Sequence, residues 1–195
     1  SGTGWTSTLT LSGDETEQST VFSCASHVDA ALNAGATDTS ATSGAVTVDL
    51  TLPTLAIVMA SNNADTSKAK SGDNIVLTIT ASESVTLLVC TIDEEATTMG
   101  GSGTGWTSTL TLSGDETEQS TVFSCASFLD ATGNAGATDT SATSGAVTVD
   151  LTLPTLGIAM ASNNGQAATQ ATTGNNIVLT ITASESVTLL VCTID

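Results

Sequence analysis

Cationic side chains are almost missing from this sequence of 195 residues, which has two Lys or Arg against 20 Asp or Glu and a formal net charge of −18. Binding to nucleic-acid phosphates requires clustered cations, and Lys68 and Lys70 are the only Lys or Arg residues. The same scarcity argues against docking on an anionic membrane surface. No apolar run reaches the roughly 18 to 20 residues that span a bilayer. The sequence therefore predicts neither nucleic-acid binding nor membrane insertion.

Aromatic residues are also scarce, at 3% of the sequence with no Tyr. An acidic chain with few aromatics is disordered only when its hydrophobicity is low as well, and here 39% of the residues are hydrophobic. The sequence is rich in Thr, Val and Ile, whose β-branched side chains suit a pleated sheet. The composition therefore predicts a folded, all-β chain.

The sequence repeats itself with a period of about 100 residues. Residues 1–26 recur letter for letter at 102–127, and close similarity returns in residues 33–55 and 134–156. Residues 74–93 recur at 176–195. A period of this length fits one independently folded β-sandwich domain in each repeat.

Proline is nearly absent, and its two occurrences mark the expected domain junctions. Pro53 and Pro154 stand at equivalent positions, and Pro lacks the N–H group that a β-ladder needs. This frame predicts the C-terminal half of one repeat in residues 1–52, a complete repeat in 53–153, and the N-terminal half of the next in 154–195. Because no initiator Met is present, we expect Ser1 to be a processed terminus or an interior point of a longer chain.

Period-two alternation of apolar residues predicts six or seven strands in the complete repeat, with Leu55, Ile57 and Met59 on one buried face. The expected strands cover residues 55–59, 75–81, 85–93, 106–112, 121–129 and 147–152, with a short one near 96–99. Gly, Asn and Asp predict turns at residues 71–74, 100–103, 113–115 and 132–134. Short strands at this spacing indicate an antiparallel β-sandwich.

Four motifs carry a resemblance to a known family: ASNN…GD…TASE in residues 60–83, GxxW at 103–106, DxxGNxG at 130–136 and VxVDxTxP at 147–154. Over its whole length the chain resembles the bacterial-type immunoglobulin-like tandem repeats of large extracellular surface and adhesin proteins. The resemblance implies tandem immunoglobulin-like sandwiches of about 100 residues each, at the cell surface or outside the cell, with no catalytic site. The sequence departs from this family in having cysteines, and in having Leu32 where the second copy has Gly133.

The four cysteines stand at two kinds of position in the repeat, Cys24 with Cys125 and Cys90 with Cys192. A single His cannot complete a zinc site in both copies, so disulfides are expected in an extracellular setting. In the frame chosen above, Cys90 pairs with Cys125 on neighbouring strands of the immunoglobulin-like sheet. Cys24 and Cys192 are then candidates for disulfides to neighbouring segments. The alternative pairs Cys24 with Cys90 and Cys125 with Cys192.

The acidic residues 14–17 and 115–118, with Asp29, Asp130, Asn33 and Asn134, could offer oxygen ligands to calcium. Their spacing matches no EF-hand, and the capping of turns is the favoured interpretation. The sequence thus predicts no cofactor, with calcium as the alternative.

Catalytic groups are not predicted. Glu94 and Glu95 are interpreted as solvated residues of a turn rather than as the paired carboxylates of a glycosidase. A Ser-His-Asp site is not expected either, because His27 is replaced by Phe128 in the second copy. We therefore expect no enzymatic activity.

The sequence predicts a structural repeat unit of an extracellular fibre, cell-surface filament or adhesin stalk. Its expected partner is itself, as neighbouring repeats of a tandem array or by complementation between half-domains. The alternatives are an adhesin module that binds glycan or protein through loops such as residues 94–103, and a spacer domain of a large secreted enzyme. No Asn-x-Ser/Thr sequon is present, so exposed Ser and Thr are expected to carry O-linked rather than N-linked sugars.

Overall fold

The computed structural model describes residues 3–165 and 167–195, and every regular element within them is a β-strand. The prediction of an all-β chain built largely of antiparallel sheets is confirmed. The chain divides into two compact units, Ser1–Val149 and Asp150–Asp195, and the finer three-part frame drawn from the prolines stays a prediction. The described residues include no helix of the length and apolar character that would cross a membrane.

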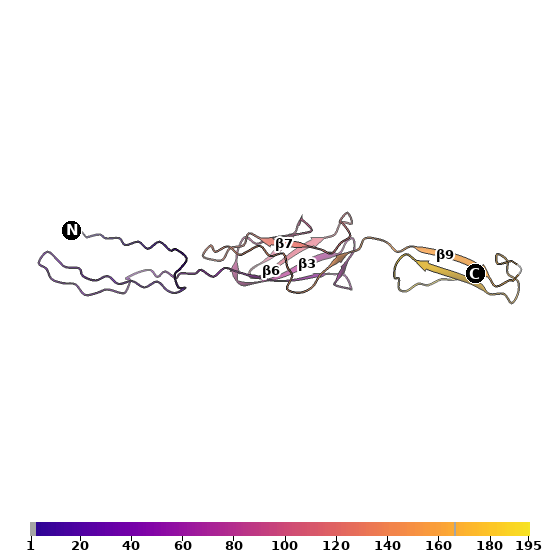
Figure 1. Cartoon of the computed structure of the whole chain (residues 1–195), viewed down its shortest axis with the longest axis horizontal. Helices are drawn as coiled ribbons and strands as arrows, with labels where there is room; N and C mark the ends of the chain where they lie inside the picture. The colour runs from indigo at the N-terminus through magenta and orange to yellow at the C-terminus, as the bar shows by residue number, and fades with distance from the viewer. Residues whose placement is uncertain (1–2, 166) are drawn as a thin grey trace. The chain divides into compact units, whose positions relative to one another are not determined.

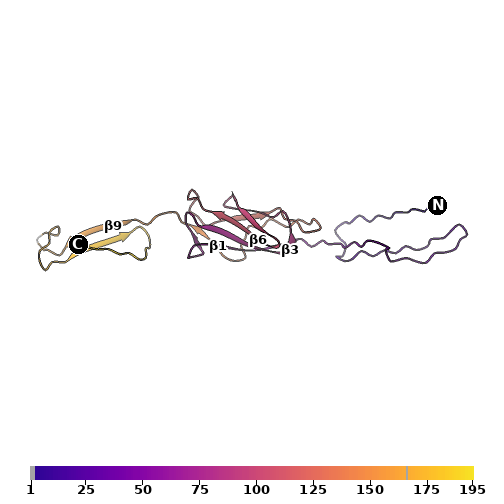
Figure 2. The same cartoon turned by 180° about the vertical axis from the view of Figure 1, so that it is seen from behind.

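The first sheet of the larger unit has three antiparallel strands in the order β1 (Leu55–Ser61), β3 (Asn74–Val85) and β6 (Thr98–Thr111), which Figures 1 and 2 show from opposite sides. Ile57 on β1 lies opposite Ile79 on β3, and both side chains are almost completely buried. Alternate residues of a strand point to opposite faces, so one face of this sheet forms a wall of the core.

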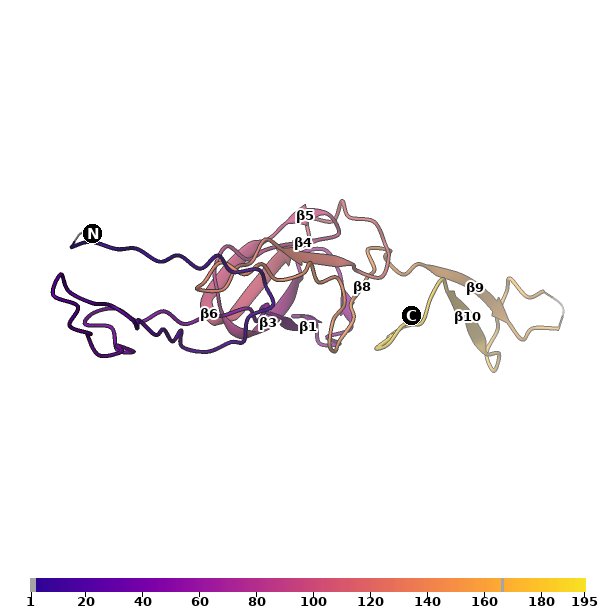
Figure 3. The ribbon, with the colours of Figure 1, turned by 60° about the vertical axis from the view of Figure 1, so that its left-hand side comes forward.

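The second sheet has the order β5 (Glu95–Ala96), β4 (Val89–Ile92) and β7 (Phe123–Ala126). Figure 3 shows β4 and β5 across the unit from β1 and β3. A third, short pair joins β2 (Lys68–Ala69) to β8 (Thr148–Val149) in parallel. This parallel pair was not predicted, because Lys68 and Ala69 stand in a polar stretch with no apolar alternation.

Apolar side chains from both sheets and from the connecting segments form the core of this sandwich-like unit. As predicted, Ile57 and Met59 are buried, while Ala56 and Val58 on the other face of β1 are exposed. Each fully buried aliphatic or aromatic side chain contributes about 1.5 to 3 kcal/mol. The largest buried side chains are Phe128, Ile57, Ile75, Leu77, Ile79, Ile92, Leu112, Val85, Val147 and Val149.

The single strand predicted at residues 85–93 is two strands in the structure, so this prediction is wrong. Val85 ends β3 in the first sheet, and Val89 begins β4 in the second. Between them Leu87 has a φ of 62°, a left-handed conformation that is uncommon for a leucine. This backbone reversal carries the chain from one sheet to the other. Ser127, with a φ of 61°, similarly follows the end of β7.

Residues 100–103, where a turn is predicted, fall within the bounds of β6. Gly101 has a φ of 98°, and a Cβ atom there would lie 2.3 Å from the carbonyl oxygen of Gly105. The pairing of β3 with β6 shifts register between Thr80 and Val85. Residues four apart in an extended strand lie about 13 Å apart, so the close approach of Gly101 to Gly105 shows that the backbone of β6 turns sharply here.

The N-terminal part of the larger unit, residues 3–52, contains only isolated β-bridges. Ser19 pairs with Thr47, Cys24 with Asp38 and Val28 with Ala34. All three bridges recur in the second copy, between Ser120 and Thr148, Cys125 and Asp139, and Leu129 and Ala135. The first copy thus shares local pairings with the second but lacks its continuous strands.

The smaller unit is an antiparallel pair, β9 (Leu156–Ser162) with β10 (Ile177–Ala183), visible at the yellow end of Figure 1. Ile158 lies opposite Ile181, which is the counterpart of the pairing between Ile57 and Ile79 in β1 and β3. The same sequence thus forms the same register in both copies.

Candidate functional site

Cys90 on β4 and Cys125 on β7 lie opposite each other in the second sheet and form a disulfide. Both residues are buried. The bond joins residues separated by 35 positions, and closing a loop of this size contributes about 3 to 4 kcal/mol in the chain-entropy model. The alternative pairing, which would use Cys24 and Cys192, is not the one that the structure contains.

Cys24 and Cys192 are free and exposed. The backbone N–H of Cys24 donates to the carbonyl oxygen of Asp38 at 2.8 Å, and the N–H of Asp38 donates back at 2.9 Å. Cys125 and Asp139 exchange the same two hydrogen bonds, both at 2.9 Å. The backbone around Cys24 therefore already matches that of its disulfide-bonded counterpart.

Each incomplete repeat exposes side chains whose counterparts form the core of the complete repeat. Leu9 is 72% exposed, whereas Leu110, in an identical sequence context, is 6% exposed. Ile158 is 57% exposed, whereas its counterpart Ile57 is 0% exposed. The exposed side chains whose counterparts are buried include Leu9, Leu11, Phe22 and Val46 in the first segment, and Ile158, Met160, Ile177, Leu190 and Ile194 in the last.

The aromatic side chains follow the same division. Phe123 and Phe128 are buried in the core. Trp5 and Phe22 are exposed, although the sequence around them is repeated in the second copy. Sequence alone therefore does not decide the burial of these residues.

The turn after β7 is organised by Asp130, whose side chain is almost fully buried. Its Oδ1 accepts hydrogen bonds from the backbone N–H groups of Thr132, Gly133 and Asn134 at 2.8, 2.7 and 2.8 Å, and its Oδ2 accepts one from Asn134 Nδ2 at 2.8 Å. Burial alone would raise the pKa of Asp130, but the hydrogen bonds from Asn134 and Thr132 outweigh it and lower the pKa to about 2. Asp130 is therefore ionised at neutral pH.

This turn holds the chain segment that precedes the complete repeat. Asn134 Nδ2 donates to the carbonyl oxygen of Asp49 at 3.1 Å. From the first copy, Glu17 Oε1 accepts a hydrogen bond from the backbone N–H of Leu50 at 3.0 Å and another from Thr51 Oγ1 at 2.5 Å. The hydrogen bonds from Thr51 and Leu50 lower the pKa of Glu17. Residues 49–51, which form the junction between the two copies, are thus hydrogen-bonded both to the first copy and to the second.

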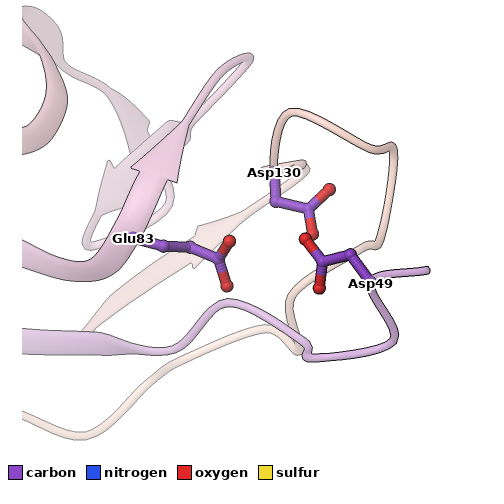
Figure 4. Close-up of side chains that lie close together, drawn as sticks. All are labelled: Asp49, Glu83 and Asp130. Atoms are coloured by element: carbon purple, nitrogen blue, oxygen red, sulfur yellow. The ribbon is translucent and has the colours of Figure 1, made fainter. Parts of the chain in front are cut away.

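Three carboxylates meet at the same junction, from Asp49, Glu83 on β3, and Asp130 (Figure 4). One oxygen from each lies within 4.8 Å of the other two. Burial raises the pKa of Glu83, and so do the negative charges of Asp130, Asp49 and Glu17. These groups repel one another when all are ionised.

This arrangement could hold a divalent cation, since Ca²⁺ takes oxygen ligands at 2.3 to 2.6 Å and two opposite ligands then lie about 5 Å apart. Of the three residues, only Asp130 was among the ligands suggested by the sequence. Asp49 and Glu83 were missed, although the VxVDxTxP and TASE motifs that contain them recur at Asp150 and Glu185. Nothing in either motif shows that the two meet across the junction.

Three of the other suggested calcium ligands, Glu15, Glu116 and Asp29, cap turns. The carboxylate of Glu15 accepts from the backbone N–H groups of Ser12 and Gly13, both at 2.8 Å, and these bonds lower the pKa of Glu15 to about 2. Glu116 makes the same contacts in the second copy. Asp29 Oδ1 caps its turn by accepting from the N–H of Asn33 at 2.8 Å. Turn capping, the interpretation favoured from the sequence, is therefore the role that the structure shows for Glu15, Glu116 and Asp29.

The residues considered for catalysis are exposed. Glu94 lies in the turn between β4 and β5, Glu95 begins β5, and both face solvent, as does His27. A catalytic carboxylic acid needs burial or a close like charge to raise its pKa. The interpretation of Glu94 and Glu95 as solvated residues agrees with this placement.

No model of a known protein family, no curated protein and no solved structure matches this chain. The resemblance to bacterial-type immunoglobulin-like repeats therefore stays a prediction from the motifs.

Proposed function

We propose that this chain is a structural segment of an extracellular fibre, cell-surface filament or adhesin stalk. The observation that carries the proposal is the hydrogen bond from Asn134 to Asp49, which fixes the end of one repeat to the body of the next. A flexible linker would leave consecutive domains free to reorient. A bonded junction instead favours a stiff array, as a stalk requires.

The repetition of sequence supports the same proposal at the level of the domain. We take each repeat to be an immunoglobulin-like β-sandwich of about 100 residues. The register shared by the β1–β3 and β9–β10 pairs supports this view. Each identical unit then adds the same length and the same junction to the array.

An extracellular location is supported by the buried disulfide between Cys90 and Cys125, since disulfides persist in oxidising compartments. The net charge of −18 gives every repeat an acidic surface. This charge keeps the array soluble and opposes the lateral pairing of exposed β-edges. The charge thus opposes aggregation between neighbouring arrays, while the repeats can still associate end to end.

A glycan- or protein-binding module is less well supported. That alternative used residues 94–103 as a recognition loop, and most of them lie in β5 and β6. A structural array remains the function that the junction favours.

Small-angle X-ray scattering tests the proposal on chains that carry one, two or three copies of residues 53–153 between the same two ends. We expect the maximum dimension to grow linearly, by about 40 Å for each copy, which is the length of a strand of 12 to 14 residues. Growth with the square root of the copy number would indicate freely jointed domains and would contradict a stiff stalk.

A further inference from the structure

The uncovered half-domains at the two ends of the chain have complementary sequences. In the complete repeat, the stretch that begins at Pro53 is covered by the stretch that begins at Ser102. Residues 154–195 closely repeat the first stretch, and residues 1–52 closely repeat the second. Building on the proposed function, we propose that residues 154–195 of one copy complete the sandwich of residues 3–48 of a second copy, and that Cys192 then forms a disulfide with Cys24.

The register of this interface follows from the complete repeat. There, Ile75 on β3 lies opposite Leu110 on β6, and Cys90 lies opposite Cys125. The counterparts are Ile177 opposite Leu9, and Cys192 opposite Cys24. All four counterparts are exposed in the single chain. Pairing would add a strand to the open edge of β10 and bury both apolar faces.

The last segment already has the strand pairing that this interface needs, and the first segment has part of its local pairing. The β9–β10 pair has the register of β1–β3, and the bridge between Cys24 and Asp38 matches that between Cys125 and Asp139. The last segment therefore needs little reorganisation before pairing, which lowers its share of the entropic cost of association, whereas the first segment forms its continuous strands on pairing.

A second copy is a better partner than the other end of the same copy. The chain enters the complete repeat at Thr54, whose N–H donates to Ser82 Oγ beside the start of β1. It leaves at Thr148, whose N–H donates to the carbonyl oxygen of Ser67, beyond the far end of β1. These two points are separated by about the length of β1, roughly 20 Å. Closure within one copy would require both ends to fold back over the complete repeat, whereas pairing between copies extends the array.

The cross-link needs an oxidant, for which a small-molecule disulfide such as glutathione disulfide suffices. The Cys24 thiol loses its proton, and the thiolate attacks one sulfur of the small disulfide, forming a mixed disulfide and releasing one small thiol. The Cys192 thiolate then attacks the Cys24 sulfur and releases the second small thiol. Two cysteine thiols are oxidised, and one small disulfide is reduced to two thiols.

The test uses the 195-residue chain over a range of concentrations, with glutathione disulfide or with a reductant. Light scattering measures association, and peptide mass spectrometry of gel-separated species locates the disulfides. We expect concentration-dependent multimers in both conditions, and a covalent ladder that contains Cys24 joined to Cys192 only in the oxidising one. Cys192→Ser should keep the multimers and abolish the ladder.

Ile177→Asp places a charge in the interface and should weaken association at least tenfold, whereas Thr180→Asp is the matched control. The counterpart of Thr180 is Thr78, which faces solvent in the complete repeat, so this variant should associate normally.

Monomers at every concentration, or a monomer with an internal bond between Cys24 and Cys192, would overturn the pairing between copies. Multimers without the Cys24–Cys192 bond would overturn only the cross-link. None of these results would decide the stiffness of the array, which the scattering series measures separately.

Discussion

Asn134 reaches back 85 residues along the sequence to donate a hydrogen bond from Nδ2 to the carbonyl oxygen of Asp49, at 3.1 Å. The equivalent residue of the first copy, Asn33, forms the same turn with Asp29, its Nδ2 donating to Asp29 Oδ2 at 2.8 Å. The turn thus forms in both copies, and the second copy uses it to hold the preceding segment.

This difference makes Asn33 and Asn134 a matched pair for mutation. Asn134→Ala removes the bond to Asp49, and we expect it to destabilise the complete repeat by about 1 kcal/mol and to speed amide hydrogen exchange near Asp49. Asn33→Ala should leave the unfolding transition of the complete repeat unchanged. Urea titration and exchange mass spectrometry measure both effects. Equal effects from the two variants would show that the junction contact adds nothing to the turn.

The carboxylate group at the junction predicts a stabilising mutation. The pKa of Glu83 is raised by burial and by the charges of Asp130, Asp49 and Glu17, so its ionised form opposes folding above that pKa. In the presence of a chelator, Glu83→Gln should raise the melting temperature at pH 7. The gain should disappear as the pH falls to the ordinary glutamate value of 4.5, because the wild-type carboxyl is then protonated in the folded state.

Glu185→Gln removes the same charge from the last segment and serves as the control. It should leave the melting of the complete repeat unchanged at every pH. A Glu83→Gln variant that melts at a lower temperature in chelator would show that the carboxylates do not repel one another in the folded protein.

Asp130 predicts the opposite dependence on pH. Its pKa is lowered from 3.8 to about 2, so the ionised carboxylate adds stability above pH 3.8, and this contribution is lost as the pH falls towards 2. Asp130→Asn should destabilise the complete repeat at pH 7, and the gap to wild type should narrow between pH 4 and pH 2. Thermal melts across this range measure the gap, with Asp29→Asn as the control in the incomplete copy. A gap that stays constant with pH would contradict the assigned role of the charge.

Much of the complete repeat could be predicted from its sequence, because alternation reports the facing of side chains directly. Ile57, Ile75 and Ile79 lie on the buried face as expected. The sheet change at Leu87 was not predictable, since a leucine with a φ of 62° leaves no mark in the apolar pattern. The run of glycines around Gly101 predicts a turn, and the backbone does turn sharply there, but within the bounds of strand β6.

The junction was harder to predict than the strands. Asp130 and Asn134 are recognisable as a turn from the DxxGNxG motif, but the meeting of Asp49 with Glu83 depends on how three distant segments pack. Similarly, Leu9 and Leu110 stand in the same local sequence. Leu9 is nevertheless exposed and Leu110 buried, because their surroundings in the fold differ. Local sequence patterns therefore specify the strands and turns, whereas the carboxylate group at the junction and the burial of Leu110 depend on tertiary contacts.

The disulfide predicts a mechanical signature. When an array of repeats is stretched, the bond between Cys90 and Cys125 keeps 35 residues from extending. Reduction should therefore increase the length released by each unfolding repeat by about 120 Å, at roughly 3.5 Å for each residue. Single-molecule force measurements with and without reductant record this difference. Equal lengths would show that the disulfide is not formed in the repeat.

Electron microscopy of the native material to which this chain belongs tests the structural role most directly. The account predicts a regular filament whose axial period is about one sandwich length, roughly 40 Å for strands of 12 to 14 residues, or a small multiple of it. Dispersed particles without axial periodicity would contradict it.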